Sequence, residues 1–105
     1  MTEYLVKNSP KRQPTHPGAI LREDVLPAMT ISVSDFARGL GVSRQVLHRI
    51  LAETHGITPE MALRIGEFLG NGPELWLRMQ QDYDLWQARD AMKTTLDRIR
   101  RNKAA

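Results

Sequence analysis

The chain has 105 residues, of which 41% are hydrophobic and 26% charged, so it can form one globular domain and is too apolar for a disordered chain. Its formal net charge of +3 permits nucleic-acid binding without requiring it. The lack of cysteine excludes a disulfide framework and a zinc ribbon, and no apolar run approaches the roughly 20 residues of a membrane span, so we expect a cytoplasmic protein with no membrane partner.

Residues 1–16 show no periodicity of apolar residues, and they contain two prolines and the basic pair Lys11-Arg12. We interpret them as a flexible N-terminal arm. An arm whose basic residues contact DNA or a partner protein is the alternative.

The first helix is expected to begin at Pro17, because the missing N–H of proline costs nothing at the first helical position, and to end near Pro27. A second helix is expected after Ser32 as N-cap, with Asp35 in the place of the acidic residue of a capping box. Gly39 lies inside this helix at a cost of about 1 kcal/mol relative to alanine. The expected inner residues of the two helices are Ile20, Leu21, Val25, Phe36, Ala37 and Leu40.

A third helix is expected from its N-cap, Ser43, to about Ala52, and Gly41 before it can adopt the left-handed conformation of a sharp turn. Two short helices joined by so short a turn with glycine form a helix-turn-helix. Helical periodicity divides the third helix into two faces. The inner face is expected to hold Val46, Leu47, Ile50 and Leu51, and the outer face Arg44, Gln45, His48 and Arg49.

The outer face of the third helix has the composition of a surface that reads DNA. An α-helix fits the major groove, and its first residues meet the base edges. Arginine and glutamine have bidentate geometry for guanine and adenine, and a serine cap at a helix N-terminus suits a phosphate. The expected DNA-binding residues are Ser43, Arg44, Gln45, His48 and Arg49. A polar face that only meets solvent is the alternative.

The fourth helix has an ordered start signal, with Thr58 as N-cap and Pro59 at its first position, and the run Gly70-Asn71-Gly72 ends it. A fifth helix is expected to begin at Pro73. The expected inner residues of the fourth helix are Met61, Ala62, Ile65, Phe68 and Leu69, and those of the fifth that step at three and four are Leu75, Trp76, Met79, Tyr83 and Trp86. We expect Trp76, Tyr83 and Trp86 to pack on the first and fourth helices or on a dimer mate, and a toxin-binding groove is the alternative. No segment alternates in the manner of a strand, so the sequence predicts an all-α fold.

The C-terminal segment carries an apolar seam that so small a core cannot wholly cover. The seam consists of Leu85, Met92, Leu96 and Ile99. Residues 86–105 carry six basic side chains against two acidic ones, a net charge of +4, whereas residues 57–85 have two against five, a net charge of −3. We therefore expect contact with another chain, and the expected interface residues are Trp86, Met92, Leu96 and Ile99.

Four segments of the chain, in this order, resemble the XRE-type helix-turn-helix family, and more closely the HigA-type antitoxins of bacterial toxin–antitoxin pairs. They are "HPGAILREDVLPAM" at 16–29, "FARGLGVSRQVLHRIL" at 36–51, "GITPEMALRIGEFLG" at 56–70 and "PELWLRMQQDYDLWQA" at 73–88. They cover more than half of the chain. Three positions depart from the pattern: Val33 stands where many relatives of the wider fold have glutamine, Gly39 where alanine is common, and Gly72 where a serine cap is usual.

The resemblance implies a five-helix lambda-repressor-like domain with a C-terminal helical extension. It implies a homodimer that binds a palindrome in its own operator, and a HigB-type (RelE-like) endoribonuclease toxin as a second partner. It also implies that Ser43 contacts phosphate and that Arg44, Gln45 and Arg49 contact bases. The corresponding domain limits are 1–16 for the arm, 17–82 for the helix-turn-helix domain and 83–105 for the extension.

The expected function is that of an antitoxin and autorepressor without enzymatic activity. A basic toxin would be repelled by the +4 tail, so we assign the seam to self-association and the acidic region 57–85 to the toxin. Burial of the seam against the toxin despite the charge is the alternative. A solitary XRE-type regulator without a toxin is the alternative. A module that binds only proteins is a third interpretation, and the basic outer face argues against it. No metal or cofactor is expected, because His16, His48 and His55 are irregularly spaced.

Overall fold

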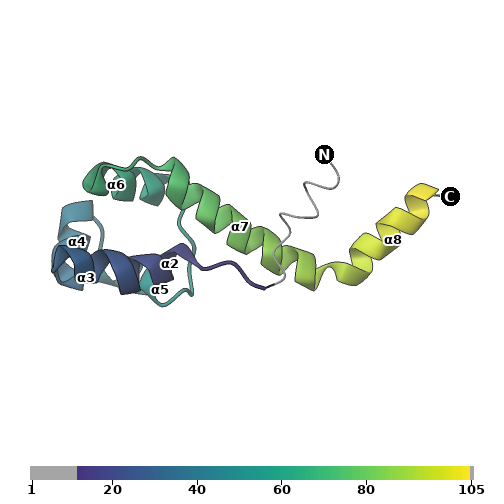
Figure 1. Ribbon diagram of the computed structural model, residues 1–105, viewed down its shortest axis with the longest axis horizontal. Coiled ribbons are helices and arrows are strands. Elements are labelled where there is room, and N and C mark those ends of the chain that lie inside the picture. Colours follow the sequence, from purple (N-terminus) through teal and green to yellow (C-terminus); the bar gives the residue numbers. More distant parts are fainter. Residues whose placement is uncertain (1–11, 105) are drawn as a thin grey trace.

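A helical body lies at one end of an elongated molecule, and two C-terminal helices extend from it (Figure 1). The computed structural model describes residues 12–104, so residues 1–11 of the expected arm lie outside the described part. Every regular element within residues 12–104 is helical, which confirms the all-α fold. The elements are α2 (Pro17–Ile20), η1 (Leu21–Val25), α3 (Leu26–Met29), α4 (Val33–Leu40), α5 (Arg44–Leu51), α6 (Pro59–Leu69), α7 (Glu74–Ala91) and α8 (Lys93–Ala104).

The elements α2, η1 and α3 form one continuous helical segment, which runs past Pro27 instead of ending there. Proline inside an α-helix lacks a donor, and its ring meets the carbonyl four residues back. The helix widens just before this position, where the Leu26 N–H bonds to the Leu21 carbonyl five residues back. The segment ends only at Thr30, whose φ of 52° is left-handed. The expected end near Pro27 is therefore wrong.

The first helix begins at Pro17, as expected, and its N-cap is His16, which the sequence did not indicate. The His16 Nδ1 accepts a hydrogen bond from the Gly18 N–H at 2.8 Å. The imidazole is buried, and its ring meets the edge of the Tyr83 ring with centroids 4.8 Å apart. This contact joins the start of α2 to the middle of α7.

The three predicted N-caps are confirmed. The side-chain oxygens of Ser32, Ser43 and Thr58 accept hydrogen bonds from the backbone N–H three residues on, at 3.0, 3.1 and 3.2 Å. The core lies between the helices that these caps start, the first helical segment and the start of α7. It is formed by Leu21, Leu26, Phe36, Ala37, Leu40, Leu47, Ile50, Leu51, Ile57, Met61, Ala62, Ile65 and Trp76.

The ring of Phe68, on α6, explains why position 39 holds a glycine. A Cβ atom at position 39 would lie 2.3 Å from Cε1 of the Phe68 ring, so the ring occupies the space that alanine would need. The same ring meets the edge of Phe36 with centroids 5.4 Å apart. Phe68 was expected to be buried, yet it is 39% exposed, because it covers the outside of α4 rather than entering the core.

The helix α7 is anchored to the body through Gln80, which is buried. Its Oε1 accepts a hydrogen bond from the Ile57 N–H at 2.8 Å, and its Nε2 donates one to Asp84 at 3.0 Å. The helix continues unbroken across position 82 and ends at Ala91. The helix α8 follows a turn at Met92 and lies apart from the body (Figure 1). Among residues 12–104, no helix is both long and apolar enough to cross a membrane.

Burial of His16 gives the fold a pH dependence. Desolvation lowers its pKa below the ordinary 6.5, against the opposing effects of Glu53 and Asp84. Because the unfolded chain binds the proton more tightly, His16 contributes fully to stability above about pH 6.5, and this contribution is lost as the pH falls towards the lowered pKa. We expect the free energy of unfolding to fall less between about pH 7.5 and pH 5.5 in His16→Asn than in the wild type. The asparagine amide can accept the same hydrogen bond, and it does not titrate in this range.

Urea unfolding at the two pH values measures this difference. The matched control is His48→Asn, since His48 is exposed. Equal pH dependence of the wild type and His16→Asn would contradict the assignment.

Candidate nucleic-acid interface

The turn between α4 and α5 has the form expected of a helix-turn-helix. Gly41 is left-handed, with φ of 73°. Its N–H bonds to the Arg38 carbonyl at 3.2 Å, and the Val42 N–H bonds to the Ala37 carbonyl at 3.0 Å. These bonds satisfy two carbonyls at the end of α4, and α5 starts after Ser43 in a new direction.

The carbonyl end of α4 is held further by Arg64 of α6. Its guanidinium donates to the Leu40 carbonyl at 2.8 Å and to the Gly41 carbonyl at 3.3 Å. It also meets the Glu60 carboxylate at 3.3 Å. A cation at the C-terminus of a helix satisfies carbonyls that have no partner within the helix and suits the negative end of the helix dipole.

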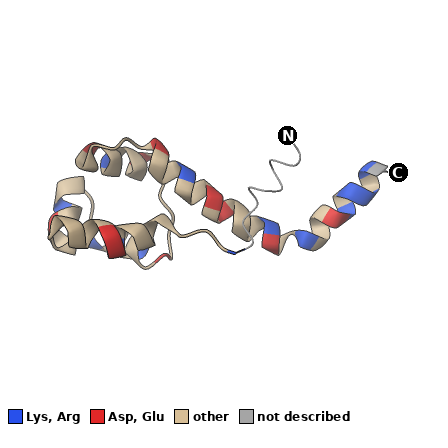
Figure 2. Cartoon of the chain, viewed as in Figure 1, with Lys and Arg blue, Asp and Glu red and all other residues tan. Residues whose placement is uncertain are grey.

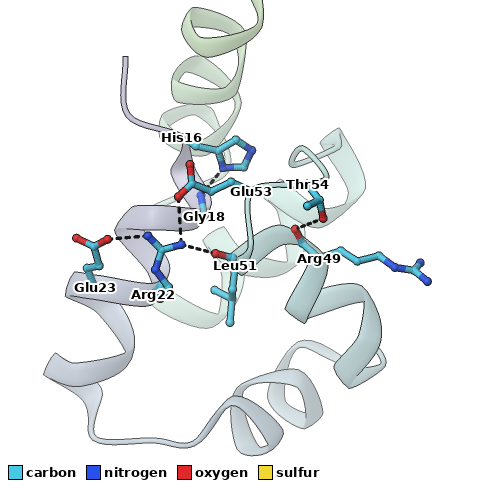
Figure 3. Close-up of polar contacts among 8 residues, drawn as sticks. All are labelled: His16, Gly18, Arg22, Glu23, Arg49, Leu51, Glu53 and Thr54. Carbon is cyan, nitrogen blue, oxygen red and sulfur yellow. Dashed lines mark hydrogen bonds and ion pairs between the residues drawn. The ribbon is translucent and has the colours of Figure 1, made fainter. Parts of the chain in front are cut away.

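The carbonyl end of α5 is held by a second arginine, Arg22 of η1. Figure 3 shows its guanidinium between Glu23, Glu53 and the Leu51 carbonyl, with bonds of 2.6, 3.1 and 2.5 Å. The hydrogen bonds to Glu23 and Glu53 raise the pKa of Arg22, so it stays charged. The Arg49 carbonyl accepts from the Thr54 hydroxyl at 3.1 Å. Both ends of α5 are therefore fixed, by Ser43 at the start and by Arg22 at the end.

The outer face of α5 is exposed as predicted, and it consists of Arg44, Gln45, His48 and Arg49. Within residues 12–104, neither Arg44 nor Arg49 makes an ion pair with a carboxylate. The Arg49 side chain points away from the body (Figure 3). The Ser43 hydroxyl oxygen accepts the hydrogen bond of the cap, and within residues 12–104 the hydroxyl donates none, so its proton can reach an external acceptor. The contact of these residues with DNA stays a prediction.

Val46 does not lie on the inner face of α5. It is 38% exposed, whereas Leu47, Ile50 and Leu51 are buried as expected. Position 46 lies at the edge of the apolar stripe, beside a small hollow of about 160 Å³ that Arg49 and Thr58 also line. The expected inner position of Val46 is therefore wrong, and the interface includes one aliphatic side chain among its polar ones.

The predicted interface residues of the C-terminal segment lie on α7, on α8 and in the turn between them. Met92 and Ile99 are 42% and 54% exposed, and Trp86 and Leu96 are partly buried. Figure 2 shows basic residues gathered along α8 and acidic residues along the middle of α7. Among the described residues, no three histidine or carboxylate side chains are grouped closely enough to hold a metal ion.

Residues 21–77 match a family model described as helix-turn-helix. Virulence-associated protein I of Dichelobacter nodosus is 42% identical over 70% of this chain and 68% of its own. The structure of the Pseudomonas aeruginosa antitoxin HigA with the higBA promoter is 34% identical, with a TM-score of 0.78, over 82% of this chain and 94% of that one. The structure of antitoxin GraA in complex with its operator is 38% identical, with a TM-score of 0.75, over 81% of this chain and 86% of that one.

We expect Arg64→Met to lower the free energy of unfolding by about 1 kcal/mol, because the Leu40 carbonyl loses a charged donor that is itself partly exposed. Urea unfolding measures the change. Arg78→Met on α7 is the control, since the Arg78 side chain is exposed and has no hydrogen bond to a described residue. Equal stability of the two variants would show that Arg64 does not hold the end of α4.

Proposed function

Because the chain belongs to the helix-turn-helix family that includes the HigA-type antitoxins, we propose that it is a DNA-binding antitoxin and autorepressor. It binds a palindrome in its own operator as a homodimer. It also neutralises a HigB-type (RelE-like) toxin by binding it. The family is one of DNA-binding regulators and antitoxins rather than a class of enzymes, so the mechanism is one of binding alone.

The observation that carries the DNA-binding part is the outer face of α5. Arg44, Gln45 and Arg49 are exposed on an eight-residue helix whose two ends are fixed. Such a helix enters the major groove of DNA with its first turns next to the base edges. The arginines donate to guanine O6 and N7, and the glutamine donates to and accepts from adenine. Two relatives solved with DNA support this assignment, HigA with the higBA promoter and GraA with its operator.

The sequence-independent part of the interaction comes from the start of α5. The Ser43 hydroxyl donates to a phosphate oxygen, and the positive end of the helix dipole lies beside it. His48 lies one turn after Arg44 on the same exposed side and extends the polar contact along the groove. These contacts set the position of the helix, and the arginine and glutamine contacts set the preferred sequence.

The toxin part of the proposal rests on a groove between the first helix, α6 and the start of α7. This groove has a volume of about 570 Å³ and is lined mainly by apolar side chains, among them Met29, Phe68 and Leu75. Asp24 also lines the groove, and Phe68 and Leu75 belong to the acidic region 57–85, with its net charge of −3. An apolar groove with a carboxylate in its lining suits a partner that brings apolar and basic side chains.

Specific DNA binding is tested with the DNA upstream of the protein's own gene. We expect a mobility shift by a dimer, with two half-sites about 34 Å apart, one turn of the double helix. Random DNA of the same length is the control. Equal affinity for both DNAs would refute the proposed repressor function.

The roles of the α5 residues are separated by two substitutions. Arg49→Ala should cost about 1–3 kcal/mol of operator binding and relax the preference at one base pair, because a bidentate base contact is lost. Ser43→Ala should weaken operator and random DNA alike, because a phosphate contact carries no sequence information. Affinities for operators with single base changes measure both. If Arg49→Ala weakened all DNAs equally, Arg49 would be a phosphate ligand.

The toxin groove is tested by Leu75→Lys, which puts a positive charge among its apolar residues. We expect capture of a HigB-type toxin to fall by about ten-fold or more, roughly 1.4 kcal/mol, while operator binding is unchanged. Leu63→Lys is the matched control, because Leu63 is 59% exposed on α6 and does not line the groove. Equal capture by both variants would place the toxin elsewhere, and a wild type that captures no toxin would indicate a solitary regulator.

A further inference from the structure

Val46 is an aliphatic residue of α5 whose side chain reaches the surface. It is 38% exposed, whereas Leu47, Ile50 and Leu51 of the same helix are buried. Its backbone N–H donates to the Ser43 hydroxyl at 3.1 Å, so Val46 belongs to the capped first turn of α5. The first residues of a helix in the major groove are the ones that meet base edges. Val46 therefore lies where the proposed interface reads DNA, although its side chain has no hydrogen-bonding group.

Helical geometry places Val46 beside Arg49. The two residues are three positions apart, and residues three and four apart are neighbours on a helix surface. Ile50, four positions after Val46, is buried, so Val46 stands between the buried side of α5 and the exposed Arg49. Arg44 and His48 lie on the opposite side of the exposed face. The Arg49 side chain points away from the body (Figure 3), and Val46 lies next to its base.

A hollow of about 160 Å³ adjoins both residues. Ile50 and Met61 also line it and are only 3% and 7% exposed, so part of the lining consists of core side chains. Thr58, at the cap of α6, is an exposed residue of the same lining. The hollow has room for a methyl group, which is about as large as a water molecule. Val46 and the hollow together form a small, largely apolar surface within a polar interface.

Thymine is the base that presents an apolar group in the major groove, its 5-methyl group. The other bases present amino donors and ring or carbonyl acceptors there. A donor or acceptor placed against Val46 would lose water without gaining a partner, which costs free energy. A methyl group placed there loses only its contact with water, which is favourable. The chemistry of this surface therefore favours thymine over the other three bases.

We propose that Val46 is a specificity-determining residue, which selects thymine by packing against its 5-methyl group at the hollow. The selected base pair adjoins the one that Arg49 contacts. The two side chains start about 4.5 Å apart along α5, and successive base pairs are about 3.4 Å apart along DNA, so neighbouring side chains meet neighbouring base pairs. This inference rests on the proposed DNA binding by α5, and it specifies one base of each half-site.

Replacement of thymine by deoxyuridine tests the contact without changing the protein, because it removes the methyl group and keeps the base pair. Each thymine in the protected segment of the DNA upstream of the gene is replaced in turn, and mobility shift measures the affinity. We expect one thymine in each half-site whose replacement weakens binding by the wild type about four-fold, which corresponds to about 0.8 kcal/mol for one buried methyl group. A wild type that tolerates every replacement would overturn the inference.

Val46→Ala identifies the side chain that makes the contact. Alanine keeps the helix and the backbone N–H of the cap, and it removes both γ-methyl groups. We expect this variant to bind the natural operator about four-fold or more weakly and to lose its sensitivity to deoxyuridine at the selected thymine. Leu63→Ala is the matched control, since Leu63 is 59% exposed on α6 and does not line the hollow, and it should keep the sensitivity of the wild type.

The outcomes separate this inference from the function it rests on. If Val46→Ala stayed as sensitive to deoxyuridine as the wild type, another side chain would contact the methyl group, and the role of Val46 would be refuted. A wild type that prefers the upstream DNA to random DNA but tolerates every deoxyuridine refutes only the role of Val46. Equal affinity of the wild type for upstream and random DNA refutes both the role of Val46 and the DNA-binding function.

Discussion

The orientation of α5 depends on how the carbonyl ends of the two helices of the helix-turn-helix are satisfied. Short helices leave a large share of their carbonyls without a partner inside the helix. Here two arginines from other elements supply the donors: Arg64 of α6 reaches the Leu40 carbonyl, and Arg22 of η1 reaches the Leu51 carbonyl. Each arginine also forms an ion pair with a glutamate, so its guanidinium is held between a carboxylate and a backbone carbonyl. Contacts with both the first helix and α6 therefore fix the angle between α4 and α5.

This arrangement separates the charged residues into two groups with different tasks. Arg22 and Arg64 bond to carbonyls and carboxylates of the protein, whereas Arg44 and Arg49 are exposed on α5 and pair with no carboxylate within residues 12–104. The acidic residues of α7 and the basic residues of α8 lie on the two C-terminal helices that extend from the body (Figure 2). Surfaces for DNA and for protein partners can therefore lie on different sides of one small chain.

Local features of the fold were predictable from the sequence, and contacts between distant residues were not. Ser32, Ser43 and Thr58 act within three residues of themselves, and the left-handed turn at Gly41 is equally local. By contrast, the Arg22–Leu51 and Arg64–Leu40 bonds join residues 29 and 24 positions apart, and no periodicity reveals them. The burial of His16 likewise depends on Tyr83 of α7. For the candidate site, helical periodicity correctly predicted the exposed residues of α5 but misplaced Val46, because an edge position depends on what the neighbouring loop covers.

Methylation interference on the promoter DNA can show whether α5 reads an operator from the major groove. Methylation at guanine N7 lies in the major groove, where it removes the acceptor that an arginine needs, whereas methylation at adenine N3 lies in the minor groove. We expect N7 methylation to block binding at guanines in two half-sites one helical turn apart, and N3 methylation to leave binding unchanged. Binding that tolerates N7 methylation throughout the protected region would show that α5 does not read the major groove.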